Sequence, residues 1–409
     1  MKAIKVKLYP KPKQAKMFEK HFGCCRSIYN FGLELKTKTY QETKQHVSYS
    51  QISAKLIRLK EERPWLSEIN SQTLQQSLKD LESAFSHFFK KNNSFPKFKS
   101  KRNTKQSFRI PQHFQVTKDK HYIKLPKIGY VHFKDEFNIP KSVEFRNITV
   151  SREGNEYFAS ICYDTHKETP VKFKIEEEKT LGIDLGVRTL VALSDGTKIE
   201  NPKHLKKFEE KLAIEQRKLP AKELKETEEI DVDRKKIKQS SGRRNKQVLK
   251  VNKIHKKIRN IRKDFLHKLT SSLIKNQDWT SFCMEDLNVK EMIEENYSPM
   301  SKLIGDAGWR MMRGMMEYKT DEVGKNLIVI GRFDASSKTC NKCGHIYHSL
   351  GRNEKFWTCE KCNTFHDRDL NASENIKIFG LIKNGICKSL GKDFSLTNES
   401  ESNLEPTVL

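Results

Sequence analysis

Residues 180–186 read Thr180-Leu181-Gly182-Ile183-Asp184-Leu185-Gly186, which predicts a short strand with one carboxylate inside an apolar run. An unpaired charge is costly to bury, so Asp184 in such a strand needs a compensating cation. The alternative is an ordinary turn or cap residue, because the flanking Gly182 and Gly186 also fit a turn.

The segments after this stretch predict an α/β domain, because strands and helices alternate along the chain. The first of them form a hairpin meander with a turn at Asp195-Gly196. Strands are expected at 189–194, 198–200, about 279–284 and 327–330, and helices over most of 203–268 and at about 302–323.

Two further acids stand at the ends of elements in this domain. Glu285 directly follows the largely apolar strand at 279–284. Asp369 opens a helix in His366-Asp367-Arg368-Asp369-Leu370-Asn371-Ala372, where a helix N-cap is the alternative role. Carboxylates on rigid elements can hold two hard cations, one activating a water and one stabilising the leaving oxygen of a phosphodiester. As a set, the three acids predict metal-dependent phosphodiester chemistry rather than structural roles.

Four of the nine cysteines form two Cys-x2-Cys pairs, Cys340/Cys343 and Cys359/Cys362, separated by 15 residues. Each pair aims two thiolates at one centre, which predicts a closed tetrahedral zinc site with a structural role. Folding of this segment should then depend on the metal. The remaining cysteines are interpreted as small buried hydrophobic residues in a reducing compartment.

The N-terminal half reads as helices followed by an antiparallel sheet. Leu74, Leu78, Leu81 and Phe85 share one face of a helix in the segment from 11 to about 105, which ends in a basic and aromatic stretch. Short alternating strands follow at Tyr122 to Leu125, Tyr130 to Phe133, Ile148 to Ser151 and Tyr157 to Tyr163. The first ten residues read as a strand without a nearby partner, so this strand is expected to join the sheet.

The balance of 79 Lys+Arg against 52 Asp+Glu gives a formal charge of +27 and predicts a nucleic-acid partner. Residues 203–268 hold 23 basic and 10 acidic residues, a net charge of +13. Apolar residues step by three or four along one side of this segment, at Val251, Ile254, Ile258, Ile261, Phe265 and Leu269. The opposite basic face is either a nucleic-acid surface or a merely solvated face.

No apolar run reaches membrane-spanning length and the N-terminus lacks the apolar block of a signal peptide, so a cytoplasmic, nucleoid-associated protein of a bacterium or archaeon is expected. The last residues are poor in apolar side chains and predict a disordered tail.

Six motifs in family order resemble those of TnpB proteins, transposon-encoded relatives of type V CRISPR effectors. They are Gly182-Ile183-Asp184-Leu185-Gly186, Arg262-Lys263-Asp264-Phe265-Leu266-His267-Lys268, Glu285-Asp286-Leu287, Asp306-Ala307-Gly308-Trp309, Ser336-Ser337-Lys338-Thr339-Cys340 and Asp367-Arg368-Asp369-Leu370-Asn371-Ala372. The resemblance implies an α/β fold with added β-barrel and helical domains: an RNase H-like RuvC nuclease domain interrupted by a zinc ribbon, preceded by a wedge β-barrel with an inserted helical recognition domain.

The resemblance also implies boundaries for these domains. The wedge barrel takes residues 1–10 and 106–178, the helical recognition domain 11–105, the nuclease domain 179–335 and 365–385, the zinc ribbon 336–364 and the disordered tail 386–409.

By the same resemblance Asp184, Glu285 and Asp369 are the catalytic acids and hold two Mg²⁺ ions, while Cys340, Cys343, Cys359 and Cys362 hold one structural Zn²⁺. Arg368 and Asn371 stand where they would support the site. Tyr49, Ser53 and Gln75 stand at positions similar to those that contact the motif beside the target.

The implied function is RNA-guided cleavage of double-stranded DNA, with a guide called omega RNA and one protein per RNA. Reading by base pairing suits a protein that needs charge and shape more than base-reading side chains. Two alternatives stay open: an RNA-guided DNA-binding regulator that does not cleave, and an accessory transposase.

Overall fold

The structure is a computed structural model. It describes residues 1–387 apart from 102, 104, 118–120, 135–142, 167, 220–223, 231–235, 241, 297, 333 and 352–353, and for 224–230, 236–240 and 298 it describes the backbone alone. Most of the predicted tail, residues 388–409, therefore lies outside the described residues. The chain divides into two compact units, Met1–Lys167 and Glu168–Leu409.

The first unit combines helices with an antiparallel sheet. Its helices are α1 (Pro12–Thr43), α2 (Tyr49–Glu62), the 3-10 helix η1 (Pro64–Glu68) and α3 (Ser71–Phe89). Local chemistry sets their first residues: Pro12 has a backbone angle suited to a first turn, and the Asn70 side chain accepts a hydrogen bond from Gln72 N at 3.0 Å.

Seven strands form the sheet of this unit, in the order β2-β6-β7-β1-β5-β4-β3. They are β1 (Lys2–Tyr9), β2 (Lys105–Ile110), β3 (Gln115–Thr117), β4 (Tyr122–Leu125), β5 (Gly129–Lys134), β6 (Glu144–Glu153) and β7 (Glu156–Asp164). The expectation that the first strand joins this sheet is confirmed, because β1 pairs with both β5 and β7. Among the described residues no pairing joins the edge strands β2 and β3, so a closed barrel stays a prediction.

One buried cluster joins the helices and the sheet of the first unit. Phe18 and Phe22 of α1 and Ile52 of α2 belong to the same apolar cluster as Phe108 and Ile110 of β2. The predicted face of α3 is confirmed, with Leu74, Leu78 and Leu81 buried. This burial is the main stabilising contribution to the unit.

The second unit is built on a five-stranded sheet in the order β10-β9-β8-β13-β14. Its strands are β8 (Thr180–Leu185), β9 (Thr189–Leu193), β10 (Lys198–Glu200), β13 (Ser281–Glu285) and β14 (Asn326–Ile330). β8, β9 and β10 pair antiparallel, as predicted for a hairpin meander, whereas β13 runs parallel to both β8 and β14. The prediction of an α/β fold is confirmed for this unit.

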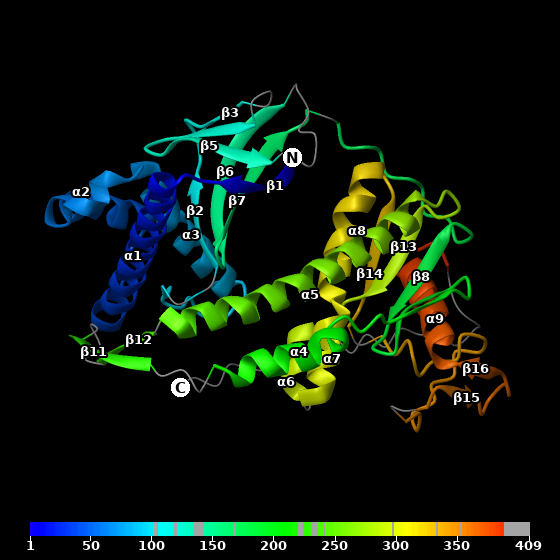
Figure 1. Cartoon of the computed structure of the whole chain (residues 1–409). Coiled ribbons are helices and arrows are strands. Elements are labelled where there is room, and N and C mark those ends of the chain that lie inside the picture. Colours follow the sequence, from blue (N-terminus) through cyan, green and yellow to red (C-terminus); the bar gives the residue numbers. More distant parts are fainter. Residues whose placement is uncertain are drawn as a thin grey trace. The chain divides into compact units, whose positions relative to one another are not determined.

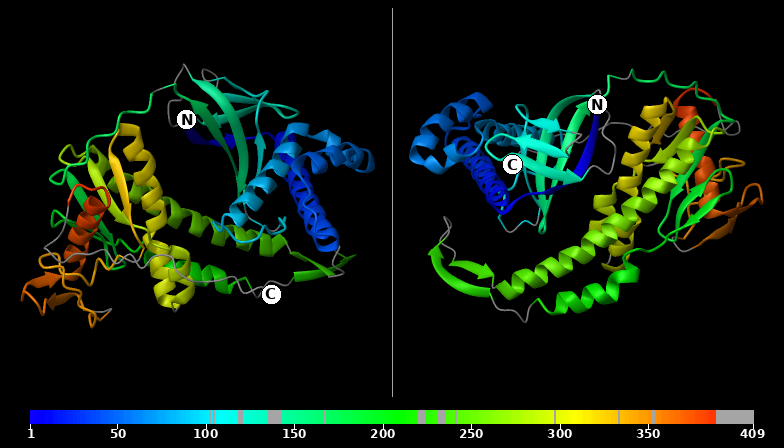
Figure 2. Two further views of the ribbon diagram at one scale, coloured as in Figure 1. Left: turned by 180° about the vertical axis from the view of Figure 1, so that it is seen from behind. Right: turned by 45° about the horizontal axis from the view of Figure 1, so that its top comes forward.

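Helices of this unit cover both faces of its sheet (Figures 1 and 2). They are α4 (Lys206–Arg217), α5 (Gly242–Lys275), α6 (Val289–Glu295), α7 (Ser298–Ala307), α8 (Trp309–Val323) and α9 (Arg368–Lys383). Phe282 and Met284 of β13 pack with α5 and α8, whereas Cys283 packs with Ile376 and Phe379 of α9. This alternation follows from the period of two in a strand and places α9 alone on one face.

Two helix predictions need correction. Residues 203–268 are not one mostly helical stretch, because the hairpin strands β11 (Leu224–Ile230) and β12 (Lys236–Ser240) separate α4 from α5. The predicted helix at 302–323 is two helices, since Gly308 adopts a left-handed φ of 73° between α7 and α8.

The predicted apolar side of the basic helix is largely confirmed. Val251, Ile254 and Ile258 of α5 are buried against Leu212 of α4. Further along, Leu266 is buried while its predicted neighbours Ile261, Phe265 and Leu269 are half-buried. The last two elements are the strands β15 (Phe356–Thr358) and β16 (Phe365–Asp367), which form the small hairpin of the cysteine-rich segment.

Candidate functional site

Two parallel strands bring Asp184 and Glu285 to the same edge of the sheet. Ile183 of β8 is in register with Met284 of β13, so the next pair along both strands is Asp184 and Glu285. Side chains alternate between the faces of a strand. Asp184 therefore shares a face with Gly182, and Glu285 shares one with Cys283, which is the face that α9 covers.

Helix α9 approaches this face closely because two glycines leave room for it. A Cβ atom at Gly182 would lie 1.9 Å from the carbonyl oxygen of Ser373, and one at Gly380 would lie 2.4 Å from the sulfur of Cys283. Asp369 stands one helical turn before Ser373, so the contact at Gly182 carries Asp369 toward the end of β8. The structure thus brings the three predicted acids into one region.

The electrostatics of Asp184 confirm this proximity. Its pKa is raised well above the ordinary value, first by burial and then by the negative charges of Glu285 and Asp369, while Arg368 acts in the opposite direction. Burial also raises the pKa of Glu285, against a hydrogen bond that the Ser336 hydroxyl donates to its carboxylate. A site in which carboxylates resist ionisation is one that favours a bound cation.

Asp367 and Asp369 have different surroundings. Asp367 caps α9, since its carboxylate accepts hydrogen bonds from Asp369 N at 3.1 Å and Leu370 N at 3.2 Å, and Lys198 Nζ lies 2.6 Å from its other oxygen. Burial opposes ionisation of Asp367, but these bonds hold its pKa below the ordinary value. The N-cap role that was the alternative for Asp369 therefore belongs to Asp367, and the Asp369 carboxylate is not used in this way.

The acids are not gathered as tightly as ligands of a single ion. Within the described part of the chain, the four cysteines are the one set of three or more His, Cys, Asp or Glu ligand atoms that all lie within 4.8 Å of one another. Like charges repel, and a site for two ions is wider, because such ions lie about 3.5–4 Å apart.

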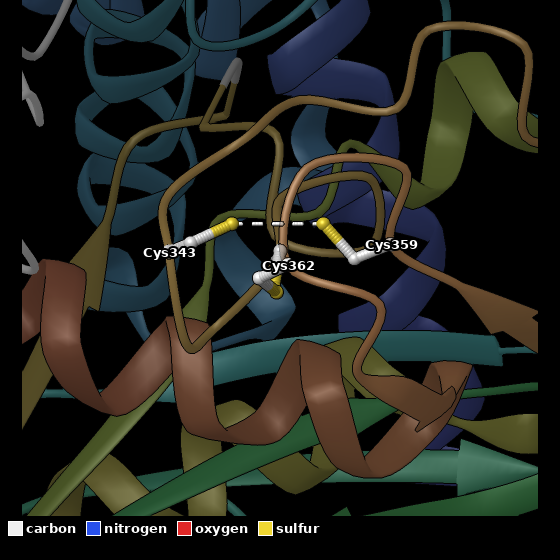
Figure 3. A group of neighbouring side chains, drawn as sticks. Cys343, Cys359 and Cys362 are labelled. Atoms are coloured by element: carbon white, nitrogen blue, oxygen red, sulfur yellow. Dashed lines mark hydrogen bonds between the residues drawn. The ribbon is translucent and has the colours of Figure 1, made fainter.

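The four cysteine sulfurs fit a zinc ion. The Cys340–Cys362 and Cys343–Cys359 sulfur pairs are both 3.6 Å apart, and Figure 3 shows the sulfurs of Cys343 and Cys359 facing each other. A tetrahedron of sulfurs about 2.3 Å from zinc has edges of about 3.8 Å. Hydrogen bonds from the Thr364 hydroxyl and backbone lower the pKa of Cys362 to about 6, which favours the thiolate that a metal requires.

Sequence reasoning missed His366, whose Nε2 atom lies 3.1 Å from the sulfur of Cys340. His366 is buried and its ring lies 4.6 Å from that of Trp357. Its place two residues after Thr364, within the second knuckle's hairpin, was the available signal.

The cysteine-rich segment is attached to α9 by a buried hydrogen-bond network. Asn371 donates to Thr339 O at 2.7 Å and accepts from Asn341 N at 3.0 Å. Asn375 donates to the carbonyl oxygens of Ser336 at 2.7 Å and Thr339 at 2.6 Å. Since Ser336 also bonds Glu285, the network links the first cysteine pair to one of the acids.

The two predicted supporting residues, Arg368 and Asn371, both face this segment. Arg368 donates to the carbonyl oxygen of Gly351 at 2.8 Å, and Asn371 belongs to the network above. Arg368 also carries one of the charges that lower the pKa of Asp184, so its position serves both the segment and the acids.

A second group of contacts involves two of the motifs that carry the family resemblance. Arg262 of α5 forms an ion pair with the buried Asp306, which also accepts a hydrogen bond from Leu205 N at 2.8 Å. Trp309 donates its indole N–H to the carbonyl oxygen of Gly186 at 3.3 Å. These contacts hold the turn that follows Asp184.

Tyr49, Ser53 and Gln75 lie together. They line one pocket of about 430 Å³ between α2 and α3 in the first unit. At its rim Lys60 Nζ donates to Ser71 Oγ at 2.9 Å. The pocket groups the predicted residues, and their role stays a prediction.

Among the described residues, no helix has the length and apolar character needed to cross a membrane.

Three family models match the chain. They are described as "Probable transposase" over residues 160–296, "Cas12f1-like, TNB domain" over 309–376 and "Helix-turn-helix domain" over 1–45. The last description differs from the structure, in which one continuous helix, α1, spans Pro12–Thr43.

A solved structure titled "Cryo-EM structure of the Cas12f1-sgRNA-target DNA complex" matches with a TM-score of 0.52 at 16% identity, covering 90% of this chain and 83% of that chain. The protein therefore has the compact fold class of Cas12f effectors.

The chain belongs to the TnpB family of RNA-guided DNA endonucleases. It is 34% identical to a "Putative RNA-guided DNA endonuclease" of Streptomyces pristinaespiralis, over 93% of this chain and 89% of that protein. It is 30% identical to the "Putative RNA-guided DNA endonuclease InsQ" of Escherichia coli K12, over 93% and 92%.

Proposed function

We propose that this protein is an RNA-guided, Mg²⁺-dependent endonuclease of a transposon, which uses an omega RNA guide and a short target-adjacent motif to cleave double-stranded DNA. The observation that carries the proposal is the convergence of Asp184 and Glu285 on the face that α9 covers, with Asp369 in the first turn of α9. The family relatives named RNA-guided DNA endonucleases support the same activity.

Asp184, Glu285 and Asp369 would hold two Mg²⁺ ions, because carboxylates on rigid elements are the ligands this cation prefers. When bound, the ions activate a water and stabilise the leaving oxygen of the phosphodiester. The residues of the chain do the positioning. Ser336 orients Glu285, the contact of Trp309 with Gly186 fixes the turn after Asp184, and Lys198 holds the start of α9 through Asp367.

The four cysteines are proposed to bind one structural zinc ion and to form the ribbon of residues 336–364, which interrupts an RNase H-like RuvC domain of 179–335 and 365–385. A closed set of four thiolates leaves no open position for substrate. The wedge barrel of 1–10 and 106–178 and the helical recognition domain of 11–105 complete the proposed organisation.

Basic surfaces supply the proposed binding of guide RNA and target DNA. The formal charge of +27 calls for a polyanion, and α5 exposes Lys246, Lys250, Lys253, Lys257 and Arg259 on the side away from its buried apolar residues. The pocket lined by Tyr49, Ser53 and Gln75 is the proposed contact for the target-adjacent motif, and one protein is expected per RNA.

A cleavage assay tests the proposal. The protein is purified with its guide RNA and incubated with a plasmid library whose target carries randomised flanks. We expect Mg²⁺-dependent linear product enriched in one flanking motif, and at least a hundredfold slower cleavage by Asp184→Asn, as for loss of a central catalytic group.

Asp195→Asn is the matched control, because Asp195 is an exposed acid in the turn between β9 and β10. Full activity in Asp184→Asn would contradict the proposal. Tight target occupancy with an intact target would instead support the RNA-guided regulator, and RNA-independent strand joining would support the accessory transposase.

A further inference from the structure

Three phenylalanine rings stand exposed within ten residues of one another in the first unit. They are Phe89 at the end of α3, Phe95 and Phe98, with relative exposures of 67%, 46% and 61%. Exposed aromatic side chains grouped in this way mark an interaction surface more often than chance. None of the three has a role in the nuclease proposed above.

The rings are held in defined positions. Phe95 stands edge-on to Phe85, with centroids 5.6 Å apart and planes at 89°, and edge-on to Phe88 at 5.3 Å and 85°. Phe89 stacks on Phe85 at 6.3 Å and 26°. Since Phe85 is partly buried against Leu81 of the core, the exposed rings rest on a fixed base.

The backbone that carries Phe98 is also fixed, although it is neither helix nor strand. Asn30 of α1 makes two reciprocal hydrogen bonds with Lys99, from Nδ2 to Lys99 O at 2.9 Å and from Lys99 N to Oδ1 at 2.8 Å. Lys99 Nζ lies 3.8 Å from the centre of the Tyr29 ring, and Pro96 is buried. A surface that is already ordered loses little entropy on binding.

The charge around the rings is of one sign. Residues 83–118 contain nine Lys and Arg and no Asp or Glu. Lys90, Lys91, Lys97 and Lys101 are exposed among the rings. Lysines are depleted from the cores of protein interfaces, so this combination disfavours a protein partner and favours a polyanion with flat apolar faces.

We propose that Phe89, Phe95 and Phe98, with Lys90, Lys91, Lys97 and Lys101, form a surface that binds unpaired nucleotides of RNA, here named the phenylalanine surface. Bases stack on aromatic rings while lysines neutralise the phosphates. RNA is chosen over DNA because the exposed amides and hydroxyl of Asn92, Asn93 and Ser94 adjoin the rings and can bond a ribose 2′-hydroxyl. The proposal deepens the proposed function by locating part of its RNA site, and rests on it in that respect.

The test measures binding of a fluorescein-labelled, unstructured 20-nucleotide RNA to the full-length protein by fluorescence anisotropy, in EDTA so that no cleavage occurs. Phe89→Ala and Phe98→Ala should each weaken binding about fivefold to a hundredfold, which is the range for loss of one stacked base. Phe98→Trp should bind like the parent, whereas Phe98→Leu, which stays apolar without a π face, should bind like Phe98→Ala.

Tyr130→Ala is the matched control, because Tyr130 is 53% exposed on β5 and has Lys124 Nζ 5.6 Å from its ring. A melting temperature equal to that of the parent shows that a variant has folded. Lys97→Ala with Lys101→Ala should reduce the slope of log Kd against log salt by about two.

Three outcomes overturn the proposal: equal affinity of all phenylalanine variants, equal weakening by Tyr130→Ala, or equal binding of a DNA of the same sequence. These results leave the nuclease proposal standing. Absence of RNA binding by the parent protein itself would overturn the proposed function as well.

Discussion

Asp184 is an unfavourable residue for the metal-free protein, because it is half-buried beside the negative charges of Glu285 and Asp369. Two residues before Asp369, Asp367 has the opposite situation. It caps a helix and pairs with Lys198. The same chemical group is therefore strained at one position and stabilising at the other, and substitution by the isosteric amide separates the two.

Asp184→Asn should raise the melting temperature of the protein in EDTA by roughly 2–4 °C, corresponding to about 1 kcal/mol of relieved repulsion. Asp367→Asn keeps an N-cap acceptor but loses the ion pair, so it should lower the melting temperature slightly. Differential scanning fluorimetry checks both. Equal shifts of one sign would contradict the assignment of the two aspartates.

Ser336 is the side chain that connects Glu285 to the cysteine-rich segment, since its hydroxyl bonds Glu285 and its carbonyl accepts from Asn375. Ser336→Ala should weaken Mn²⁺ binding about tenfold to a hundredfold, as for loss of a residue that orients a metal ligand. Isothermal titration calorimetry measures this without any cleavage. Ser337→Ala, the neighbour on the same segment, is the control and should leave the affinity unchanged.

The residues themselves carried different amounts of predictive information. Their apolar neighbours were enough to mark Asp184 and Glu285 as strand carboxylates, and the strands β8 and β13 stand where they were expected. The roles of Asp367 and Asp369 could not be separated in this way. The sequence allows a helix to begin at either residue, and only the bonds to Asp369 N and Leu370 N identify Asp367 as the cap.

At the scale of elements, the position of α9 depends on two glycines rather than on its own sequence. Gly182 of β8 meets the backbone of α9 at Ser373, and Gly380 of α9 meets Cys283 of β13. A helix set this close to a strand transmits any added volume directly, because packed interiors leave no slack.

Gly182→Ala should destabilise the second unit by about 3 kcal/mol or more, because its Cβ would lie 1.9 Å from Ser373 O and the backbone must move. Gly314→Ala is the control. Gly314 is exposed within α8 and nothing lies within 4 Å of an added Cβ, so alanine there should be neutral or stabilise by up to about 1 kcal/mol. Urea unfolding followed by fluorescence compares the two. A smaller effect at Gly182 than at Gly314 would refute the packing argument.

Elements were predictable where apolar periodicity was strong and failed where one residue decided. The stripe from Val251 to Ile258 identified α5, and alternation identified β4 to β7. The helix break at Gly308 depends on a left-handed φ and on Arg262 lying 3.0 Å from an added Cβ. Such a break is a tertiary contact that periodicity does not contain.

At the scale of the whole molecule, the division into two units separates the tryptophans. Trp65 lies in the first unit, whereas Trp279, Trp309 and Trp357 lie in the second. Each unit also has its own buried clusters. Fluorescence can therefore report the stability of one unit alone.

A zinc-selective chelator should lower the melting temperature of the second unit by roughly 5 °C or more and leave the first unit unchanged, because metal binding contributes folding free energy where the ligands are. Trp65→Phe leaves tryptophans in the second unit only, so the fluorescence transition of this variant reports that unit, while circular dichroism reports both. Added Zn²⁺ should restore the transition. A chelator effect on the first unit alone would contradict zinc binding by the four cysteines.

Charge and cysteine spacing made the molecule's partners and metal predictable, since both are properties of composition and sequence order. The network of Asn371 and Asn375 was not predictable, because these asparagines sit among ordinary helix formers and their partners are the backbone of a segment about 30 residues earlier.

The placement of α9 has a consequence for the timing of activity during synthesis. A ribosome makes β8 and β13 long before it reaches Asp369, so the growing chain carries its basic surfaces while one proposed acid is still missing. Until residue 383 has emerged, nothing covers the bed of Gly182 and Cys283. Stalled or truncated products can thus hold nucleic acid without cutting it, and the host genome meets the nuclease only as a finished chain.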